Sequence, residues 1–393
     1  MKDILIPLEP DSEIVKYGSG LYQVQLELPT TTSLTQTDVD RILQIASWEG
    51  GNIRDKINGY EGMRSVVIDK ENVSYSNGTP LRGLQVSGIG YVPTMKKVTP
   101  QAFIATSPVE TMQPPSTENF LSTFPQVGAT TSIVNGRIVP EKRDYAPTGA
   151  YAESEMRRKI AKTREVNDGR FGFSVPAVEA YGRYLNMTHG DEHLGFLVFS
   201  IPDPTLPRFA EYTTKNFKGT VNDLNQYMFT SANTLGRTAR EMHDAGFVHR
   251  QLHLANFYTV NGKLHIMDWS TKLPVAPNDM RTRTIDIRIP QQSVETLMGL
   301  YLLQPDEASL ISITFSTGMM QGYFGDDKID LLQYLNRMVK AFGGTSTSFI
   351  DDRAVIESLM AERFGLRSFR DGNVRNHPCP CGSGSKFKKC HGK

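Results

Sequence analysis

The spacing of apolar residues changes near Pro207, and this change limits the folds that the chain can adopt. Before Pro207, apolar and polar residues alternate in short runs that end at Pro or Gly, a pattern typical of β-strands. After it, apolar residues recur at helical spacing. A sheet-rich first half followed by a helical second half predicts an α+β protein with two lobes.

The same patterns predict the bounds of individual elements. Strands are predicted at residues 21–28, 65–68, 84–92, 130–139, 175–182 and 194–201. Helices are predicted at residues 37–46, 152–166, 221–245, 293–303, 309–320, 328–342 and 353–364. Residues 93–127 are rich in Pro, Ser and Thr without sustained periodicity, which indicates an insertion or a long loop.

The charge balance argues against a partner attracted by the chain as a whole. The 393 residues include 43 Lys and Arg and 42 Asp and Glu, so no overall field attracts nucleic acid or an anionic membrane. The apolar run at the N-terminus is too short and too acidic for a secretory signal, and no run approaches the length of a membrane span. We therefore expect a soluble, cytoplasmic protein with no membrane partner.

Two loops in the helical half combine side chains that suit phosphate and metal chemistry. Residues 246–256 read GFVHRQLHLAN, and residues 264–270 read LHIMDWS. Asn256 and Asp268 can supply an amide oxygen and a carboxylate, which are hard ligands suited to Mg²⁺. Gln251 can orient a nucleophile, but its amide cannot accept a proton near neutral pH.

These loops resemble the catalytic and metal-binding loops of protein-kinase-like and aminoglycoside-phosphotransferase-like enzymes. In that family the first loop reads His-Arg-Asp with an Asn five residues after the Asp, and here Gln251 stands in place of the Asp. Asp268, Trp269 and Ser270 stand where the family has Asp-Phe-Gly. The predicted order of helix, two strands, long helix and loop also agrees with this fold, and the resemblance covers residues 149–303.

The resemblance implies a bilobal kinase-like fold with ATP and magnesium as cofactors. It gives the magnesium ligands as Asn256 and Asp268. It gives the catalytic positions as His249, Arg250, Gln251 and Asp268. Loss of a general base typically lowers a rate by about 10²- to 10⁴-fold but leaves electrostatic catalysis intact. A weak kinase, a different transferase and an inactive relative therefore all stay open.

Two further residues in this half have alternative interpretations. His253 could replace the missing base, since imidazole titrates in the right range, but many relatives carry a structural His at this position. Asp286 precedes a predicted apolar helix. It is either the acid that braces the backbone of the catalytic loop in this fold or an ordinary helix cap.

A nucleotide site in this fold also needs a strand lysine paired with a carboxylate on the regulatory helix. Lys142, after the predicted strand 130–139, is the first candidate for the lysine, and Lys96 and Lys97 are alternatives. The candidate carboxylate is Glu155 or Glu153 in the first turn of the helix, although both could be solvated acids favoured by the helix dipole.

All three cysteines of the chain lie near its C-terminus. Cys379 and Cys381 stand one residue apart, and Cys390 is followed by His391. Three thiolates and an imidazole suit tetrahedral zinc, and four protein ligands make a closed, structural site. The stretch closely resembles the SEC-C motif found at the C-terminus of the SecA translocase and on unrelated proteins, a pattern that His391 fits better than the alternative His377.

The same tail is basic, because no acidic residue follows Gly372. Its cations are Arg375, Lys386, Lys388, Lys389 and Lys393. In the SEC-C family the motif binds a partner, so the resemblance implies docking of a protein substrate or partner, with a ribosome or nucleic acid as alternatives. Lysines that only keep a small module soluble are the simpler explanation.

Four regions follow from these patterns. Residues 1–130 form an N-terminal region with N-lobe elements and the insertion, residues 131–204 a kinase-like N-lobe, residues 205–366 a helical kinase-like C-lobe and residues 367–393 the SEC-C motif. The predicted function is an atypical kinase-like, ATP-dependent transferase acting on a protein. Selenoprotein O-like relatives with altered loops transfer AMP, so the group transferred is phosphoryl or AMP. The alternative is an inactive pseudokinase that serves as a protein-binding scaffold.

Overall fold

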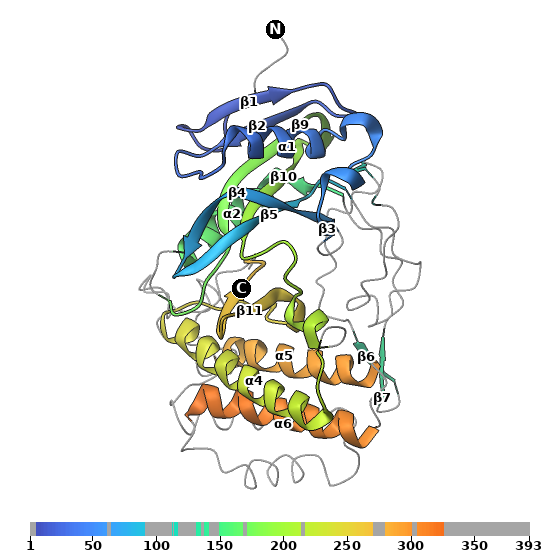
Figure 1. The fold of residues 1–393 in the computed structure, drawn as a ribbon, viewed down its shortest axis with the longest axis vertical. Helices are drawn as coiled ribbons and strands as arrows, with labels where there is room; N and C mark the ends of the chain where they lie inside the picture. The colour runs from blue at the N-terminus through green and yellow to red at the C-terminus, as the bar shows by residue number, and fades with distance from the viewer. Residues whose placement is uncertain are drawn as a thin grey trace, which may run out of the picture. The chain divides into compact units, whose positions relative to one another are not determined.

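A computed structural model of the chain divides into two units. It describes residues 5–60, 64–90, 112, 114–116, 131–134, 137–140, 149–167, 171–213, 217–269, 280–300 and 305–325. The first unit comprises Met1–Pro207 and Tyr258–Ser270, and the second comprises Arg208–Phe257 and Thr271–Lys393. Figure 1 shows the course of the chain through the sheet and the helices.

The centre of the first unit is an eight-stranded antiparallel sheet. Its strands lie in the order β1-β2-β9-β10-β5-β4-β3, and β8 pairs with β10 off this path. The strands are β1 (Glu13–Tyr17), β2 (Val24–Leu28), β3 (Gly59–Tyr60), β4 (Ser65–Ser76), β5 (Thr79–Ser87), β8 (Tyr151–Ala152), β9 (Ala177–His189) and β10 (Glu192–Ile201).

A two-residue turn joins the long hairpin of β4 and β5. Asn77 and Gly78 both have positive φ, 46° and 75°, as a type I′ turn requires. Ser76 and Thr79 on either side of the turn are register partners. Turn chemistry therefore sets the register of this hairpin, and with it which side chains point to each face of the sheet.

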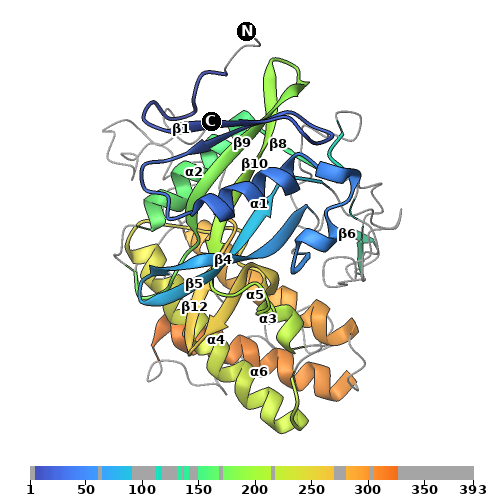
Figure 2. The ribbon, with the colours of Figure 1, turned by 45° about the horizontal axis from the view of Figure 1, so that its top comes forward.

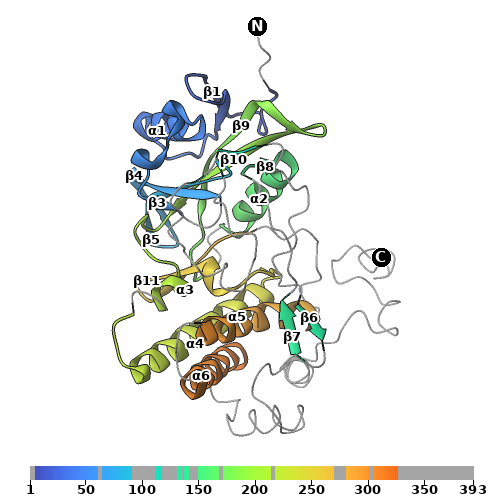
Figure 3. The same cartoon turned by 90° about the vertical axis from the view of Figure 1, so that its right-hand side faces the viewer.

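Two helices cover opposite faces of the sheet, as Figures 2 and 3 show. On one face, α1 (Gln36–Ala46) contributes Ile42 to a core that also contains Val86 of β5. On the other face, α2 (Glu153–Val166) contributes Met156 to a core with Leu197 of β10. The sheet therefore has a buried surface on both sides, which explains the nearly continuous apolar run of β10.

A short hairpin from the helical half of the sequence belongs to the first unit. It consists of β11 (Phe257–Val260) and β12 (Lys263–Ile266). The main-chain nitrogen of Ser174 donates to the carbonyl of Leu264 at 2.9 Å, and that of Ile266 donates to the carbonyl of Ser174 at 2.9 Å. These bonds attach the end of β12 to the segment that leads into β9.

The second unit is helical. Its described helices are α3 (Phe209–Glu211), α4 (Val221–Asp244), the 3₁₀ turn η5 (Leu254–Asn256), α5 (Met280–Leu300) and α6 (Pro305–Phe324). Glycines allow α4 and α6 to approach closely. A Cβ on Gly236 would lie 2.2 Å from the carbonyl oxygen of Met319, and a Cβ on Gly322 would lie 2.0 Å from that of Asn233. Any larger residue at either position would force the two helices apart.

The predicted α+β class and most predicted elements within the described residues are confirmed, although their bounds shift; the strand predicted at 84–92, for example, lies at Thr79–Ser87. Two elements differ more. The single strand predicted at 130–139 is a hairpin of β6 (Thr131–Val134) and β7 (Arg137–Pro140). The sequence between them, Asn135-Gly136, is a two-residue hairpin signal. The helix predicted at 293–303 begins much earlier, because α5 contains Pro290 without ending there.

Several predictions lie outside the described residues. They include the helices at 328–342 and 353–364 and most of the insertion at 93–127. Among the helices that the structure describes, none is long and apolar enough to cross a membrane.

Candidate active site

An aspartate inside α5 holds the backbone of the loop that contains His249. The carboxylate of Asp286 accepts a hydrogen bond from the main-chain nitrogen of His249 at 2.6 Å and another from that of Arg250. It also lies 3.1 Å from Nε2 of His243 in α4. The side chains of Asp286 and His243 are fully buried. The sequence left a choice between a loop brace and a helix cap, and these contacts confirm the brace.

Hydrogen bonding keeps Asp286 charged despite its burial. Burial alone would raise its pKa, but the hydrogen bond from His243 and the backbone hydrogen bond from His249 lower the pKa below its ordinary value. Burial lowers the pKa of His243, against the opposing effect of Asp286. His243 is therefore neutral near pH 7, and its other ring nitrogen lies 2.8 Å from the hydroxyl of Tyr323.

The loop itself is closed by short-range hydrogen bonds. Arg250 has a positive φ of 66°, an uncommon conformation for a residue with a side chain, and its nitrogen is one of those that Asp286 holds. Nδ2 of Asn256 donates to the carbonyl of Gln251 at 2.8 Å. Nδ1 of His253 accepts from the nitrogen of Ala255 at 3.3 Å, which supports the structural role for this histidine.

The amide of Asn256 therefore has a fixed orientation. With its nitrogen engaged by Gln251, its carbonyl oxygen is the atom that suits a hard cation. Asn256 belongs to the second unit and Asp268 to the first. Within the described residues, no three or more His, Cys, Asp or Glu side chains lie close enough together to hold a metal ion.

Asp268 follows β12 in the first unit and has a strained backbone. Its φ is 59°, and its side chain is 44% exposed. The next residue, Trp269, anchors this conformation: its ring is buried, stacks at 6.1 Å on Phe173, and donates from Nε1 to the carbonyl of Ile266 at 3.0 Å. The buried indole thus holds the chain while the neighbouring carboxylate stays accessible.

Two cations of the first unit meet near this carboxylate. The ammonium of Lys159, on α2, forms an ion pair with Asp268. Arg64 forms an ion pair with Glu155 of α2 at 3.0 Å. Both cations face the ring of Tyr151, with the guanidinium carbon 3.6 Å and the ammonium 5.5 Å from its centroid. These five residues form the cluster that we call the cation cluster.

The surrounding anions keep both cations charged. Burial alone would lower the pKa of Lys159, but Asp268, with smaller effects of Tyr151 and Glu155, raises the pKa above its ordinary value. The pKa of Arg64 is likewise raised, because Tyr151 and Glu155 outweigh burial. The cluster thus contains two permanent positive charges at neutral pH.

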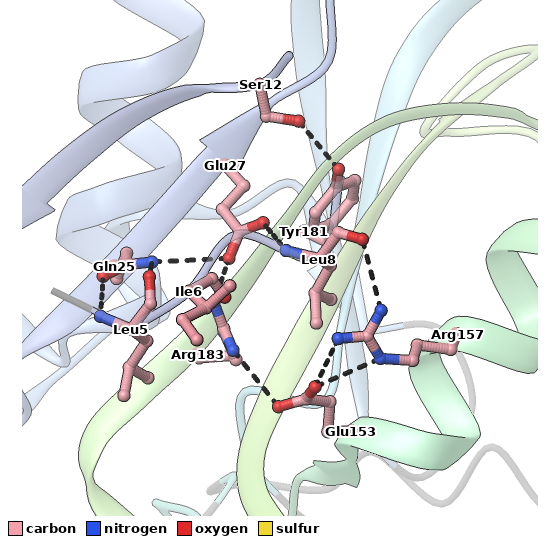
Figure 4. A network of polar contacts seen from close by, with 10 residues as sticks. All are labelled: Leu5, Ile6, Leu8, Ser12, Gln25, Glu27, Glu153, Arg157, Tyr181 and Arg183. Atoms are coloured by element: carbon pink, nitrogen blue, oxygen red, sulfur yellow. Dashed lines mark hydrogen bonds and ion pairs between the residues drawn. The ribbon is translucent and has the colours of Figure 1, made fainter. Parts of the chain in front are cut away.

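The N-terminal strap, residues 5–12, ties the start of α2 to the sheet (Figure 4). Arg183 of β9 pairs with Glu27 of β2 at 2.5 Å and with Glu153 of α2 at 3.2 Å. The nitrogen of Leu8 donates to Glu27 at 2.6 Å, and Arg157 of α2 donates to the carbonyl of Leu8 at 3.2 Å. These bonds fix the first turns of α2 and so position Lys159 further along the same helix.

Some predicted site residues have defined partners in the structure, and others lie outside its described residues. It assigns Glu155 to Arg64 and Glu153 to Arg157 and Arg183. Several predicted residues lie outside the described part of the chain: Lys96, Lys97, Lys142, Cys379, Cys381, Cys390 and His391. Their roles stay predictions.

Sequence reasoning missed Lys159 and Arg64. Lys159 had a usable signal, because its helical spacing puts it on the same face as the buried Met156 and Thr163. A lysine on an apolar face is rarely buried without a partner. Arg64, just before β4, had no comparable signal.

Comparison with known proteins identifies one segment. Residues 375–393 match the SEC-C motif family. The chain carries a SEC-C motif. The protein translocase subunit SecA of Desulforamulus reducens is 41% identical over 66 residues, which are 16% of this chain and 7% of that protein. The chain thus corresponds to a small part of that relative, and the SEC-C motif typically binds zinc.

Three solved structures show a distant similarity to this chain. WaaP in complex with acyl carrier protein is 12% identical, with 79% of this chain and 90% of that chain covered at a TM-score of 0.30. A mutant of the PAN3 pseudokinase of Neurospora crassa is 11% identical. The match covers 84% of this chain and 69% of that chain, with a TM-score of 0.28. A MAP kinase of Leishmania major is 13% identical. The match covers 78% of this chain and 94% of that chain, with a TM-score of 0.26.

The order of elements in this chain, from α2 through β9, β10 and α4 to the braced loop, is the order predicted from the sequence. No specific activity follows from this order alone.

Proposed function

We propose that this chain is an atypical kinase-like transferase that uses ATP and Mg²⁺ to modify a protein. The observation that carries the proposal is the brace by Asp286, which holds the nitrogens of His249 and Arg250. The brace holds the loop that contains Gln251 and Asn256 in a defined shape, as positioning of a substrate and a metal ion requires. In this loop the family's proton acceptor is replaced by Gln251, while His249, Arg250 and Asn256 keep the family's residue types.

Each unit carries a side chain that suits magnesium. In the first unit, Asp268 offers a partly exposed carboxylate. In the second unit, Asn256 offers an oriented amide oxygen. Magnesium bound by Asp268 would neutralise charge on the phosphates of a nucleotide. Gln251 would accept a hydrogen bond from a substrate hydroxyl through its amide oxygen and orient it, while the hydroxyl proton would leave to solvent.

Two reactions are compatible with this site. In phosphoryl transfer, the hydroxyl oxygen bonds to the γ-phosphorus, the bond to the β,γ-bridging oxygen breaks, and ADP leaves. In AMP transfer, the hydroxyl oxygen bonds to the α-phosphorus, the bond to the α,β-bridging oxygen breaks, and pyrophosphate leaves. Each releases one proton, and neither requires the protein to form a covalent intermediate.

The SEC-C motif supplies the second part of the proposal. Cys379, Cys381, Cys390 and His391 would bind a structural zinc, since three thiolates and an imidazole make a closed tetrahedral shell. The basic tail around them would then dock an acidic protein substrate or partner. Retention of ribosomes or nucleic acid by the tail, and not of a protein, would redirect this part of the proposal.

The test uses ATP labelled at the α or the γ phosphorus. Label from the γ position on protein supports a kinase, and label from the α position supports AMP transfer. Asp268→Asn should abolish either signal, whereas Asp191→Asn, in an exposed turn, should leave it unchanged. Transfer that survives Asp268→Asn would overturn the site assignment.

A second candidate function is a pseudokinase scaffold. It is favoured by one observation, the ion pair in which Lys159 occupies Asp268. This function predicts that no label is transferred to protein with Mg²⁺ or Mn²⁺, even when a captured partner is present. If the tail still binds that partner, the result favours a scaffold over a transferase.

A further inference from the structure

The central strands of the sheet provide no lysine for a nucleotide. β5, β9 and β10 read TPLRGLQVS, AVEAYGRYLNMTH and EHLGFLVFSI. Lys70 on β4 is fully buried and lies 2.6 Å from Glu179. It also donates to the hydroxyls of Ser33, Ser74 and Ser200 at 2.6, 2.8 and 2.7 Å. Lys70 is therefore a satisfied structural cation, and the phosphates of a nucleotide require another positive partner.

The cation cluster offers that partner. The side chains of Lys159 and Arg64 are 8% and 11% exposed. They share the face of Tyr151, whose hydroxyl is fixed by Ser87 at 2.6 Å. Two positive charges that lie close together in a largely buried environment are stable only where negatively charged groups compensate them.

The two accompanying anions differ in exposure. Glu155, which pairs with Arg64, is 20% exposed, and Asp268, which pairs with Lys159, is 44% exposed. The carboxylate of Asp268 is therefore the more accessible of the two to a metal ion from solvent. A divalent cation on Asp268 would withdraw the carboxylate from Lys159, and the buried ammonium would then need a new anion.

We propose that Lys159 and Arg64 are the phosphate-binding cations of this chain, and that Lys159 exchanges Asp268 for a nucleotide phosphate. This inference rests on the proposed function, since it presumes that ATP binds. It puts the binding lysine on helix α2 and not on a strand, and so competes with Lys142. The strap that fixes the first turns of α2 would then determine where the phosphate is held.

Binding of Mg·ATP by equilibrium dialysis tests the assignment. Lys159→Met should weaken binding by about 10- to 100-fold, the loss expected for a charge-assisted contact, and Lys159→Arg should restore part of it. Lys162→Met, which removes a partly exposed lysine of the same helix that pairs with Glu165, and Lys142→Met should bind like the wild type. Circular dichroism and the Tm identify any variant that fails to fold.

The outcomes separate this inference from the proposed function. No binding by the wild type would overturn both. Binding by the wild type that Lys159→Met leaves unchanged would overturn the cation cluster alone, and loss of binding in Lys142→Met would give the role to Lys142.

A second measurement, without nucleotide, detects the exchange itself. Because Lys159 competes with a metal for Asp268, Lys159→Met should bind Mn²⁺ more tightly than the wild type in electron paramagnetic resonance titrations. Asp268→Asn should bind it more weakly. Equal Mn²⁺ affinity of the wild type and Lys159→Met would contradict the exchange, even if Lys159 proves necessary for ATP.

Discussion

Oδ2 of Asp286 lies 2.6 Å from the main-chain nitrogen of His249. The bond joins a residue inside α5 to a loop that follows α4, so the shape of the loop depends on a helix later in the chain. Because the carboxylate is buried and charged, the loop and the helix gain stability together. This interdependence allows the loop to be probed through stability as well as through activity.

Asp286→Ala should destabilise the second unit. It leaves the nitrogens of His249 and Arg250 and the ring of His243 without their shared acceptor, which we expect to cost about 3 kcal/mol or more of the free energy of unfolding. Urea unfolding measures the change. Asp191→Ala, at an exposed turn, is the control and should change stability by less than about 0.5 kcal/mol. Equal effects of the two substitutions would contradict the brace.

Gln251→Asp should increase transfer. The substitution places a carboxylate at the position that the kinase-like loop reserves for the proton acceptor, and a general base contributes about 10²- to 10⁴-fold. The measurement is the rate of label transfer from ATP to protein at saturating ATP. Gln251→Asn, which restores no base, should show no gain. A fall in rate with Gln251→Asp would mean that the amide itself is needed for catalysis.

His265 should make the first unit less stable in acid. It is fully buried beside Ser174, and burial lowers its pKa to about 3. The unfolded histidine, with an ordinary pKa of about 6.5, binds a proton in a range where the folded one does not. Stability is therefore complete above pH 6.5 and falls by up to about 1.4 kcal/mol per pH unit between 6.5 and about 3.

Urea unfolding at several pH values checks this dependence. His265→Gln removes the titrating group, so its stability should fall less steeply with acid than that of the wild type. His189→Gln, at the half-exposed end of β9, should leave the slope unchanged. Parallel curves for the wild type and His265→Gln would contradict the buried, neutral histidine.

The buried pair of Glu27 and Arg183 should matter more than its exposed neighbour. Arg183→Met leaves the carboxylate of Glu27 buried without its cation, which we expect to cost about 3–5 kcal/mol. Arg157→Met, which breaks the half-exposed pair with Glu153, should cost no more than about 1 kcal/mol. Urea unfolding compares the two variants. Faster proteolysis of residues 5–12 in Arg183→Met would show that the strap is released.

The SEC-C motif should contain about one zinc ion per chain, since four ligands close a tetrahedral shell. Elemental analysis of freshly purified protein measures it. Cys390→Ser should lose the metal together with partner retention, whereas Lys386→Ala should keep the metal and weaken only the retention. A chelator should reproduce the effect of Cys390→Ser. Protein purified without zinc would contradict the ligand assignment.

Spacing along the chain predicts the local parts of this fold well. The loop from His249 to Asn256 has a recognisable order, and the alternation in β9 and β10 predicts strands that the structure confirms. The helix predicted at 293–303 was placed too late in the chain, because α5 begins at Met280 and continues through Pro290. Such a proline is tolerated when neighbouring packing compensates for the lost hydrogen bond.

Contacts between distant residues could not be predicted in the same way. Lys159 and Asp268 are separated by 109 residues, and nothing in a charged helix or in a loop aspartate signals that the two will pair. The brace by Asp286 was anticipated only as one of two alternatives, because the sequence does not show whether the residue lies inside a helix or before it. Tertiary packing brings these residues together, and patterns in the local sequence do not predict such packing.

The strand-rich unit is discontinuous in the chain, and this has a consequence for synthesis. Residues 258–270, with the buried Trp269, complete a unit whose other residues end at Pro207. A ribosome must therefore deliver the whole intervening segment before the indole can reach Phe173. Domains that are continuous can fold as they emerge. Here all strands of the eight-stranded sheet are made first, but the first unit stays incomplete until residues 208–257 have been synthesised.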